Sequence, residues 1–184
     1  MGGIKMSKVL VITTSLRKIS NSEILADEFI KGAKDAGHDV EKISLRGRKI
    51  GFCIGCLSCQ KTGKCVIKDD MEEINKKIHD CDTVVFATPI YYYEMCGQMK
   101  TLLDRANPLY DSDYRFKNVY LLSTAAEDDE SADDRAIEGL CGWIECFERA
   151  KFAGTVFVGG VNDPGEIKGS EKLKEAYKLG TEVE

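Results

Sequence analysis

Runs of apolar and β-branched residues alternate with amphipathic helical patterns along this chain of 184 residues. Strands that alternate with helices predict an α/β fold, a doubly wound parallel sheet of five strands with helices on both faces. A polar second strand suits a sheet edge and, with right-handed crossovers, favours the strand order 2-1-3-4-5. The predicted strands are residues 8–13, 39–45, 83–87, 118–123 and 155–158, and the predicted helices are 22–36, 71–78, 98–106, 132–150 and 170–179.

The order 2-1-3-4-5 reverses its winding between the first and third strands, and ligands of such sheets bind at the carboxyl ends of those strands. The loop after the first strand, TTSLRKISNS, is rich in hydroxyl groups, contains Arg17 and leads directly into a helix. A helix start of this kind suits a phosphate group. The chain has neither G-x-G-x-x-G nor G-x-x-x-x-G-K-[ST], which argues against a Rossmann dinucleotide site or a P-loop. The alternative is a capping box of Ser20 and Glu23, which needs no ligand.

Four of the eight cysteines fall in one irregular stretch, residues 46–68, with the spacing C-x2-C-x2-C-x5-C. A compact triplet completed by a fourth cysteine is the arrangement with which ferredoxin-type sequences hold a 4Fe-4S cluster. Zinc is the first alternative, because four thiolates also form a tetrahedral site. Free or disulfide-forming thiols are the second alternative, and the spacing alone leaves all three open. The four cysteines are Cys53, Cys56, Cys59 and Cys65.

The composition limits the classes of function. A formal net charge of −5 argues against nucleic acid or an anionic membrane as the main partner. The sequence shows no apolar run long enough for a spanning helix and no signal peptide, so we expect a cytoplasmic protein with reduced cysteines. The length fits a single domain over residues 1–184, with residues 1–5 as an extension that has no role in the fold.

Aromatic residues follow the third predicted strand, which we expect to stop at Pro89. Tyr91, Tyr92 and Tyr93 are suited to wall a flat ring or to form an aromatic interface, and both uses can hold together. With Trp143 and Phe147 they offer more aromatic surface than one cleft needs. We therefore expect a homodimer or a dimer of dimers.

The helix expected at residues 98–106 carries three charged residues near its end. Lys100 and Asp104 are spaced i,i+4, which favours an ion pair on a helix surface. The same reasoning predicts that Arg105 also lies on the solvated face.

Three segments, TTSLRKISNS, CIGCLSCQKTGKCVIKDDM and ATPIYYYEMCGQMKTLLDR, together resemble the iron–sulfur flavoprotein branch of the NADPH-dependent FMN reductases, over about residues 6–160. The resemblance implies a flavodoxin-like fold and an FMN cofactor. It implies that the phosphate is held by Ser15, Arg17, Ser20, Asn21 and Ser22. It implies that the isoalloxazine ring is surrounded by Pro89, Ile90, Tyr91, Tyr92 and the turn after the fourth strand, with Ser123, Thr124 and Ala125. It also implies that Cys53, Cys56, Cys59 and Cys65 ligate a 4Fe-4S cluster that exchanges electrons with the flavin.

The function expected from this resemblance is an FMN-dependent oxidoreductase. Electrons from NAD(P)H or a ferredoxin-like donor would pass to a small-molecule acceptor such as a quinone or a flavin. No catalytic side chain is expected, because the flavin carries the chemistry and the protein supplies position and electrostatics. The alternatives are a flavodoxin-like electron carrier that docks to partner proteins, and a zinc-stapled structural or interaction domain.

Overall fold

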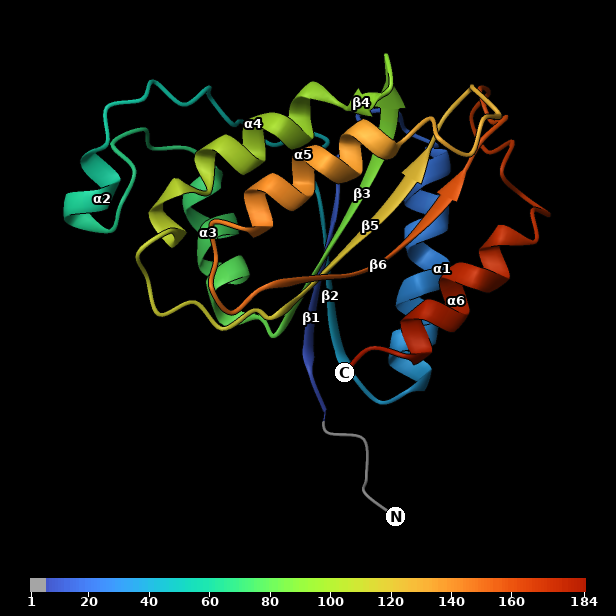
Figure 1. Ribbon diagram of the computed structural model, residues 1–184, viewed down its shortest axis with the longest axis horizontal. Coiled ribbons are helices and arrows are strands. Elements are labelled where there is room, and N and C mark those ends of the chain that lie inside the picture. The colour runs from blue at the N-terminus through green and yellow to red at the C-terminus, as the bar shows by residue number, and fades with distance from the viewer. Residues whose placement is uncertain (1–5) are drawn as a thin grey trace.

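A computed structural model of the chain describes residues 6–184, so the extension predicted at residues 1–5 lies outside the described residues. A six-stranded sheet forms its centre, with the order β2-β1-β3-β5-β6 and with β4 paired to β3 off this path (Figure 1). All pairings on the main path are parallel, and the pairing of β4 with β3 is antiparallel. The strands are β1 Lys8–Thr13, β2 Asp39–Ser44, β3 Thr83–Tyr91, β4 Glu94–Met95, β5 Asn118–Thr124 and β6 Lys151–Val158.

Helices cover both faces of the sheet (Figure 1). One face packs against α1 (Asn21–Asp35) and α6 (Lys172–Thr181), and the other packs against α3 (Met71–Asp80), α4 (Gly97–Arg105) and α5 (Asp134–Ile144). The short helix α2 (Ser58–Thr62) lies within the cysteine stretch, and the 3-10 helix η1 (Asn107–Leu109) follows α4. No helix within residues 6–184 has both the length and the apolar character needed to cross a bilayer.

The alternation of side chains along β1 shows why its sequence is apolar throughout. Val9 and Val11 belong to the core beneath α1 and α6, whereas Leu10 and Ile12 belong to the core beneath α3, α4 and α5. Successive side chains of a strand point to opposite faces of the sheet. When helices cover both faces, the side chains on both faces are buried, and the strand is therefore apolar throughout. The polar strand β2, by contrast, lies at the sheet edge, as predicted.

The α/β architecture is confirmed, but the prediction of five strands is wrong because β4 adds a sixth. Strand β3 also continues through Pro89 to Tyr91 instead of stopping at the proline. The pairing of β1 with β3 ends at Ala87, so no β1 carbonyl requires the N–H that Pro89 lacks. The two-residue turn that joins β3 to β4 consists of Tyr92 and Tyr93, both with positive φ, at 52° and 65°. Turns of this kind favour Asn and Gly, so the sequence did not indicate the hairpin.

The expectation that Trp143 and Phe147 are surplus surface aromatics is wrong. Helix α5 ends at Ile144, short of the predicted residue 150, and the chain then turns so that Phe147 enters the core. Phe147 is 4% exposed, and its ring centroid lies 4.6 Å from that of Trp143 and 5.2 Å from that of Phe116. Of the five aromatic residues expected at an interface, Tyr91, Tyr92 and Tyr93 remain exposed, and Phe52 and Tyr110 are exposed elsewhere.

Helices α1 and α6 approach closely because glycine occupies the contact. A Cβ atom at Gly180 would lie 2.1 Å from the carbonyl oxygen of Phe29, and one at Gly32 would lie 2.0 Å from that of Tyr177. Neither distance is possible for real atoms, so any side chain here would force the two helices apart. The contact fixes α1, whose N-terminus lies at the carboxyl end of β1.

We expect Gly180→Ala to lower the free energy of unfolding by about 1–3 kcal/mol, the usual cost of overpacking. Gly142→Ala is the matched control, because a Cβ at Gly142 of α5 meets no atom within 4 Å. That control should be neutral or stabilising by up to about 1 kcal/mol, since alanine is the better helix former. Urea denaturation of the wild type and of both variants measures their free energies of unfolding. If Gly180→Ala were as stable as Gly142→Ala, the close contact between α1 and α6 would be contradicted.

Candidate functional site

A small cavity of about 120 Å³ lies at the carboxyl ends of the parallel strands. It is lined by the loops that follow β1, β5 and β6 and by the last residues of β3. This is the edge at which doubly wound sheets bind their ligands. The lining residues are Ser15, Arg17, Ser20, Asn21, Pro89, Ile90, Tyr91, Thr124, Ala125, Ala126, Val161 and Asn162.

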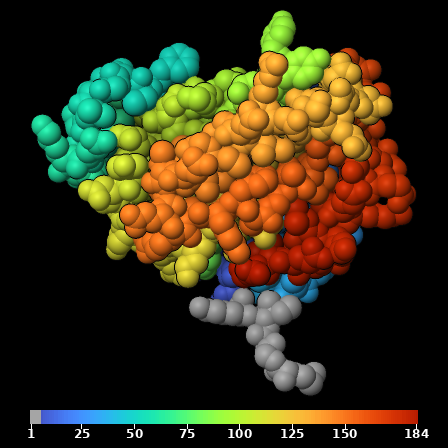
Figure 2. Space-filling model, viewed as in Figure 1, coloured from blue at the N-terminus to red at the C-terminus, as the bar shows by residue number. Residues whose placement is uncertain are grey.

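Most of the predicted site residues line this cavity, and three do not. Ser22 and Ser123 have no exposed surface, and the Ser123 hydroxyl donates a hydrogen bond to the carboxylate of Asp133. Tyr92 is 98% exposed at the tip of the β3–β4 turn, which projects from the molecule in Figures 1 and 2. Its ring therefore lies outside the cleft.

The N-terminus of α1 faces the cavity without a side-chain cap. Ser20 occupies the N-cap position, but its side chain makes no capping hydrogen bond and pairs instead with the Ser22 hydroxyl, at 3.0 Å between the oxygens. The capping box with Glu23 is therefore not formed. Uncapped N–H groups and the helix dipole both favour an anion at this point.

The side chain of Asn21 makes hydrogen bonds within the chain. Its side-chain N–H donates to the carbonyl of Asp163, at 3.0 Å, and its side-chain oxygen accepts the N–H of Ile167, at 3.3 Å. Both groups thus fasten the loop after β6 to the start of α1. Asn21 can still offer its backbone N–H to a ligand, because it is the first residue of the helix.

Arg17 spans the mouth of the cavity. Its guanidinium donates to the backbone carbonyl of Asn162, with 2.6 Å between nitrogen and oxygen. The residue is exposed, so the side chain can leave this carbonyl for a more strongly attracting anion. The cavity is smaller than the roughly 300–1,000 Å³ typical of small-molecule sites, and Arg17 and Asn162 both line it.

The sequence did not lead us to predict two features near this cavity, namely the loop after β6 and the buried carboxyl group of Asp133. Val161 and Asn162 line the cavity, and they follow the fifth parallel strand, so the rule that ligands bind at carboxyl ends could have included them. Asp133 is 2% exposed, and burial raises the pKa of this carboxyl despite the hydrogen bond from Ser123. No sequence pattern connects Asp133 with Ser123.

The cysteine stretch lies at the other end of the same sheet edge, beside α3 and α4 (Figure 1). Cys53 and Cys56 are exposed, and Cys59 and Cys65 are partly buried. Hydrogen bonds from the hydroxyl and the N–H of Ser58 lower the pKa of the Cys56 thiol. The side-chain N–H of Asn107 donates to the sulfur of Cys59, with 2.9 Å between the two atoms. The contacts at Cys56 favour its thiolate, the form that binds metals.

The four thiols are the donors that an iron–sulfur cluster requires, but they do not converge here. Within residues 6–184, no group of three or more histidine, cysteine or acidic side chains is placed to hold a metal ion. The chemistry of the donor set fits the predicted cluster, and the loop would have to close around it.

The prediction that Arg105 lies on a solvated face is wrong, although the Lys100–Asp104 pair is confirmed, at 2.6 Å. Arg105 is 1% exposed, and its guanidinium forms two hydrogen bonds with the carboxylate of Asp69, at 2.7 and 2.9 Å. It also donates to the carbonyls of Gly51 and Ile67. Asp69 in turn accepts the N–H of Gly51. One buried ion pair therefore clamps both ends of the cysteine loop to α3 and α4.

Comparison with known proteins identifies the family of this chain. The sequence profile of the family described as NADPH-dependent FMN reductase matches residues 7–141. An iron–sulfur flavoprotein of Archaeoglobus fulgidus is 34% identical over 181 residues, which cover 96% of this chain and 78% of that protein. The chain belongs to the iron–sulfur flavoprotein branch of the NADPH-dependent FMN reductase family.

Two further similarities extend this finding. An iron–sulfur flavoprotein of Methanosarcina thermophila is 27% identical over 138 residues, covering 74% of this chain and 72% of that protein. The solved structure of an NAD(P)H:quinone oxidoreductase from Methanothermobacter marburgensis superimposes with a TM-score of 0.74 at 17% identity, covering 98% of this chain and 100% of that one. The second similarity shows the shared flavodoxin-like fold. As a member of this reductase family, the chain is an oxidoreductase.

Asp69→Asn should destabilise the protein by about 3–5 kcal/mol at pH 7, because it leaves the Arg105 charge buried without its partner. Burial alone would raise the pKa of Asp69, but hydrogen bonds from Arg105, Gly51 and Met71 outweigh it and lower the pKa below its usual value. The ion pair therefore contributes fully above about pH 4 and is lost as the pH falls through the lowered pKa of the folded protein. The difference between variant and wild type should accordingly shrink below pH 4.

Urea denaturation at pH 7 and at pH 3 measures both parts of this prediction. Asp104→Asn is the matched control, since the Lys100–Asp104 pair is exposed and such pairs contribute at most about 1 kcal/mol. Hydrogen exchange in residues 46–68 should accelerate in Asp69→Asn and not in the control. Unchanged exchange would show that the ion pair does not hold the loop.

Proposed function

We propose that this protein is an FMN-dependent oxidoreductase that passes electrons from NAD(P)H or a ferredoxin-like donor to a small acceptor such as a quinone. One observation carries the proposal. The uncapped N-terminus of α1, the hydroxyls of Ser15 and Ser20, and the Arg17 guanidinium meet at one cleft with the ends of β3 and β5. Membership in a reductase family named for FMN supports the same conclusion.

Each wall of the cleft has a part in holding FMN. Ser15, Arg17 and Ser20, with the first N–H groups of α1, would bind the phosphate, and Arg17 would exchange the Asn162 carbonyl for it. Ile90 and Tyr91 from β3, with the backbone at Thr124 and Ala125, would border the ring. Bound FMN supplies the electron-transfer chemistry, and the protein orients the ring and limits its contact with water.

The cysteine loop suggests a second electron carrier. We propose that Cys53, Cys56, Cys59 and Cys65 ligate a 4Fe-4S cluster under reducing conditions. The lowered pKa of Cys56 supports this assignment, because the thiolate is the ligating form. A cluster there would supply one-electron transfer. The names of the relatives from Archaeoglobus and Methanosarcina point in the same direction.

The first test concerns the phosphate loop. The double variant Ser15→Ala and Arg17→Ala should bind FMN about 30- to 1,000-fold more weakly, because two hydrogen bonds to phosphate, one of them from a charged group, are lost. Its NAD(P)H oxidation with a naphthoquinone acceptor should fall in parallel when FMN is limiting. Lys18→Ala is the matched control, since Lys18 carries the same charge but does not line the cleft. Equal FMN affinity in the double variant and in the wild type would remove this loop from the site.

The second test concerns the cysteines. Protein purified without oxygen should contain about four irons per chain, the count of a 4Fe-4S centre, while protein purified in air should lose iron and keep FMN. Cys56→Ser should abolish iron binding and leave FMN bound, because the flavin contacts come from other loops. Cys146→Ser, which alters an exposed cysteine outside the run, should change neither. Stoichiometric zinc in the anaerobic protein would refute the cluster assignment.

The third test concerns assembly. We propose that two copies of the chain associate through the exposed aromatic turn, at least as a homodimer. Tyr91, Tyr92 and Tyr93 are all at least 47% exposed, and aromatic residues are enriched in the cores of protein interfaces. Sedimentation velocity at micromolar concentration should show a dimer, and Tyr92→Ser should weaken it. A wild-type monomer with FMN bound would exclude this arrangement.

A further inference from the structure

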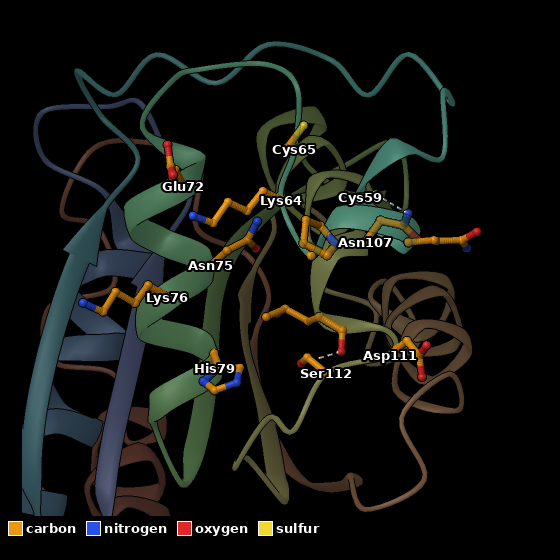
Figure 3. Close-up of a pocket in the computed structure, with 14 residues that line it drawn as sticks. Cys59, Lys64, Cys65, Glu72, Asn75, Lys76, His79, Asn107, Asp111 and Ser112 are labelled. Atoms are coloured by element: carbon orange, nitrogen blue, oxygen red, sulfur yellow. Dashed lines mark hydrogen bonds between the residues drawn. The ribbon is translucent and has the colours of Figure 1, made fainter.

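The four proposed metal ligands fall into two pairs with different surroundings. Cys59 and Cys65 are partly buried and line one cavity of about 470 Å³, between the cysteine loop, α3 and the segment that begins at η1 (Figure 3). Cys53 and Cys56 are exposed and do not line this cavity. One pair of thiols therefore already faces a common space against the body of the protein, while the other pair is open to solvent.

Helix α2, which carries Cys59, depends on its surroundings for stability. It has five residues, whereas isolated helices shorter than about 12–15 residues are marginal in water. Leu57 at its N-cap has a positive φ of 55° and provides no side-chain cap, and the Thr62 hydroxyl bonds only within the loop, to the carbonyls of Ser58 and Lys64. Because α2 packs against η1, this contact is what places Cys59 relative to the body of the protein.

Asn107, the first residue of η1, provides a directional bond in that contact. Its side-chain N–H donates to the sulfur of Cys59, with 2.9 Å between nitrogen and sulfur, and Figure 3 draws this bond as a dashed line. Asn107 lies two residues beyond Arg105, whose guanidinium is held by Asp69. The donor is therefore fixed by the same segment that closes the neck of the cysteine loop.

The second partly buried thiol lies beside a positive charge of this segment. A hydrogen bond with Asp69 is the main cause that raises the pKa of the Arg105 guanidinium, and the nearby Cys65 acts in the same direction. Residues 105–107 thus present a charge to the sulfur of Cys65 and an N–H group to the sulfur of Cys59. Donors and positive charges beside ligand sulfurs are among the features that tune an iron–sulfur centre.

We propose that Asn107 is a positioning residue, which holds the sulfur of Cys59 for the 4Fe-4S cluster and raises the reduction potential of that cluster. This inference rests on the cluster proposed above. Reduction adds one electron, and so one negative charge, to the thiolate-ligated centre, while Asn107 neither gains nor loses a proton. An N–H group directed at a ligand sulfur stabilises the more negative form, so it makes reduction more favourable.

The first test measures the reduction potential in full-length protein purified without oxygen, by titration with dithionite and EPR of the reduced cluster. Asn107→Leu removes the N–H group and keeps a side chain of similar size. It should make reduction about tenfold less favourable, which corresponds to a potential about 59 mV lower for a one-electron couple. Asn107→Asp, which has nearly the same shape but a negative charge and no N–H to donate, should lower the potential at least as much.

Ser112→Ala is the matched control, because Ser112 lines the same cavity but donates its hydroxyl to the carbonyl of Leu109 and not to a sulfur. Its potential should equal that of the wild type. Iron analysis separates this inference from the proposed cluster. About four irons per chain with equal potentials in wild type and Asn107→Leu would refute only the role of Asn107. A wild type without iron would refute the cluster, and the assignment of Asn107 with it.

A second measurement uses the metal-free chain and needs no cluster. Amide hydrogen exchange within α2 should be about fivefold faster in Asn107→Leu than in the wild type, because one hydrogen bond that holds this helix is lost. Exchange in α2 should be unchanged in Ser112→Ala. Equal exchange in β1 of all three proteins establishes that the variants are folded. Equal exchange in α2 would show that Asn107 does not position Cys59 and would overturn the proposal.

Discussion

The cysteine loop is held to the body of the protein by the buried ion pair between Arg105 and Asp69. The ion pair joins the end of α4 to the start of α3, and through Gly51 and Ile67 it closes the neck of the cysteine loop. The two terminal nitrogens of this buried guanidinium make four hydrogen bonds, which offset much of the cost of burying its charge, while its Nε has no partner within residues 6–184. The loop beyond the neck has few contacts of its own. It can therefore rearrange around a ligand while its ends stay fixed to the sheet.

The opposite layer of helices gives the cleft proposed for FMN its rigidity. Glycines let α1 and α6 pack with their backbones in contact, and Asn21 ties the start of α1 to the loop after β6. The helix N-terminus is thus held from two directions at the carboxyl end of β1. A rigid arrangement of donors costs little to organise when an anion binds, which is the physical advantage of building a phosphate site on a helix start.

The sequence was sufficient for the architecture and for most of the cleft, because both depend on local patterns. A strand such as KVLVIT must be covered on both faces, and loops at the carboxyl ends of parallel strands must meet. The predictions that failed concern residues whose partners are distant in the sequence. The i,i+4 rule found the Asp104 partner of Lys100, but the partner of Arg105 lies 36 residues away. Phe147 enters the core because α5 ends early, and the helical pattern gave no sign of that end.

The turn between β3 and β4 also differs from what its sequence indicates, because two tyrosines occupy positions with positive φ. This turn is relevant to the proposed association of two copies of the chain. Two consecutive tyrosines with positive φ each cost about 1–3 kcal/mol relative to a relaxed backbone. The β3–β4 pairing and the guanidinium of Arg135, 5.8 Å from the ring centroid of Tyr93, hold the turn in place. Within the part of the chain that the structure describes, nothing packs on the ring of Tyr92, which is 98% exposed. A strained turn that presents an uncovered aromatic ring beside a cofactor cleft is better explained by a contact with another molecule than by the stability of this chain, which supports the proposed association of two copies.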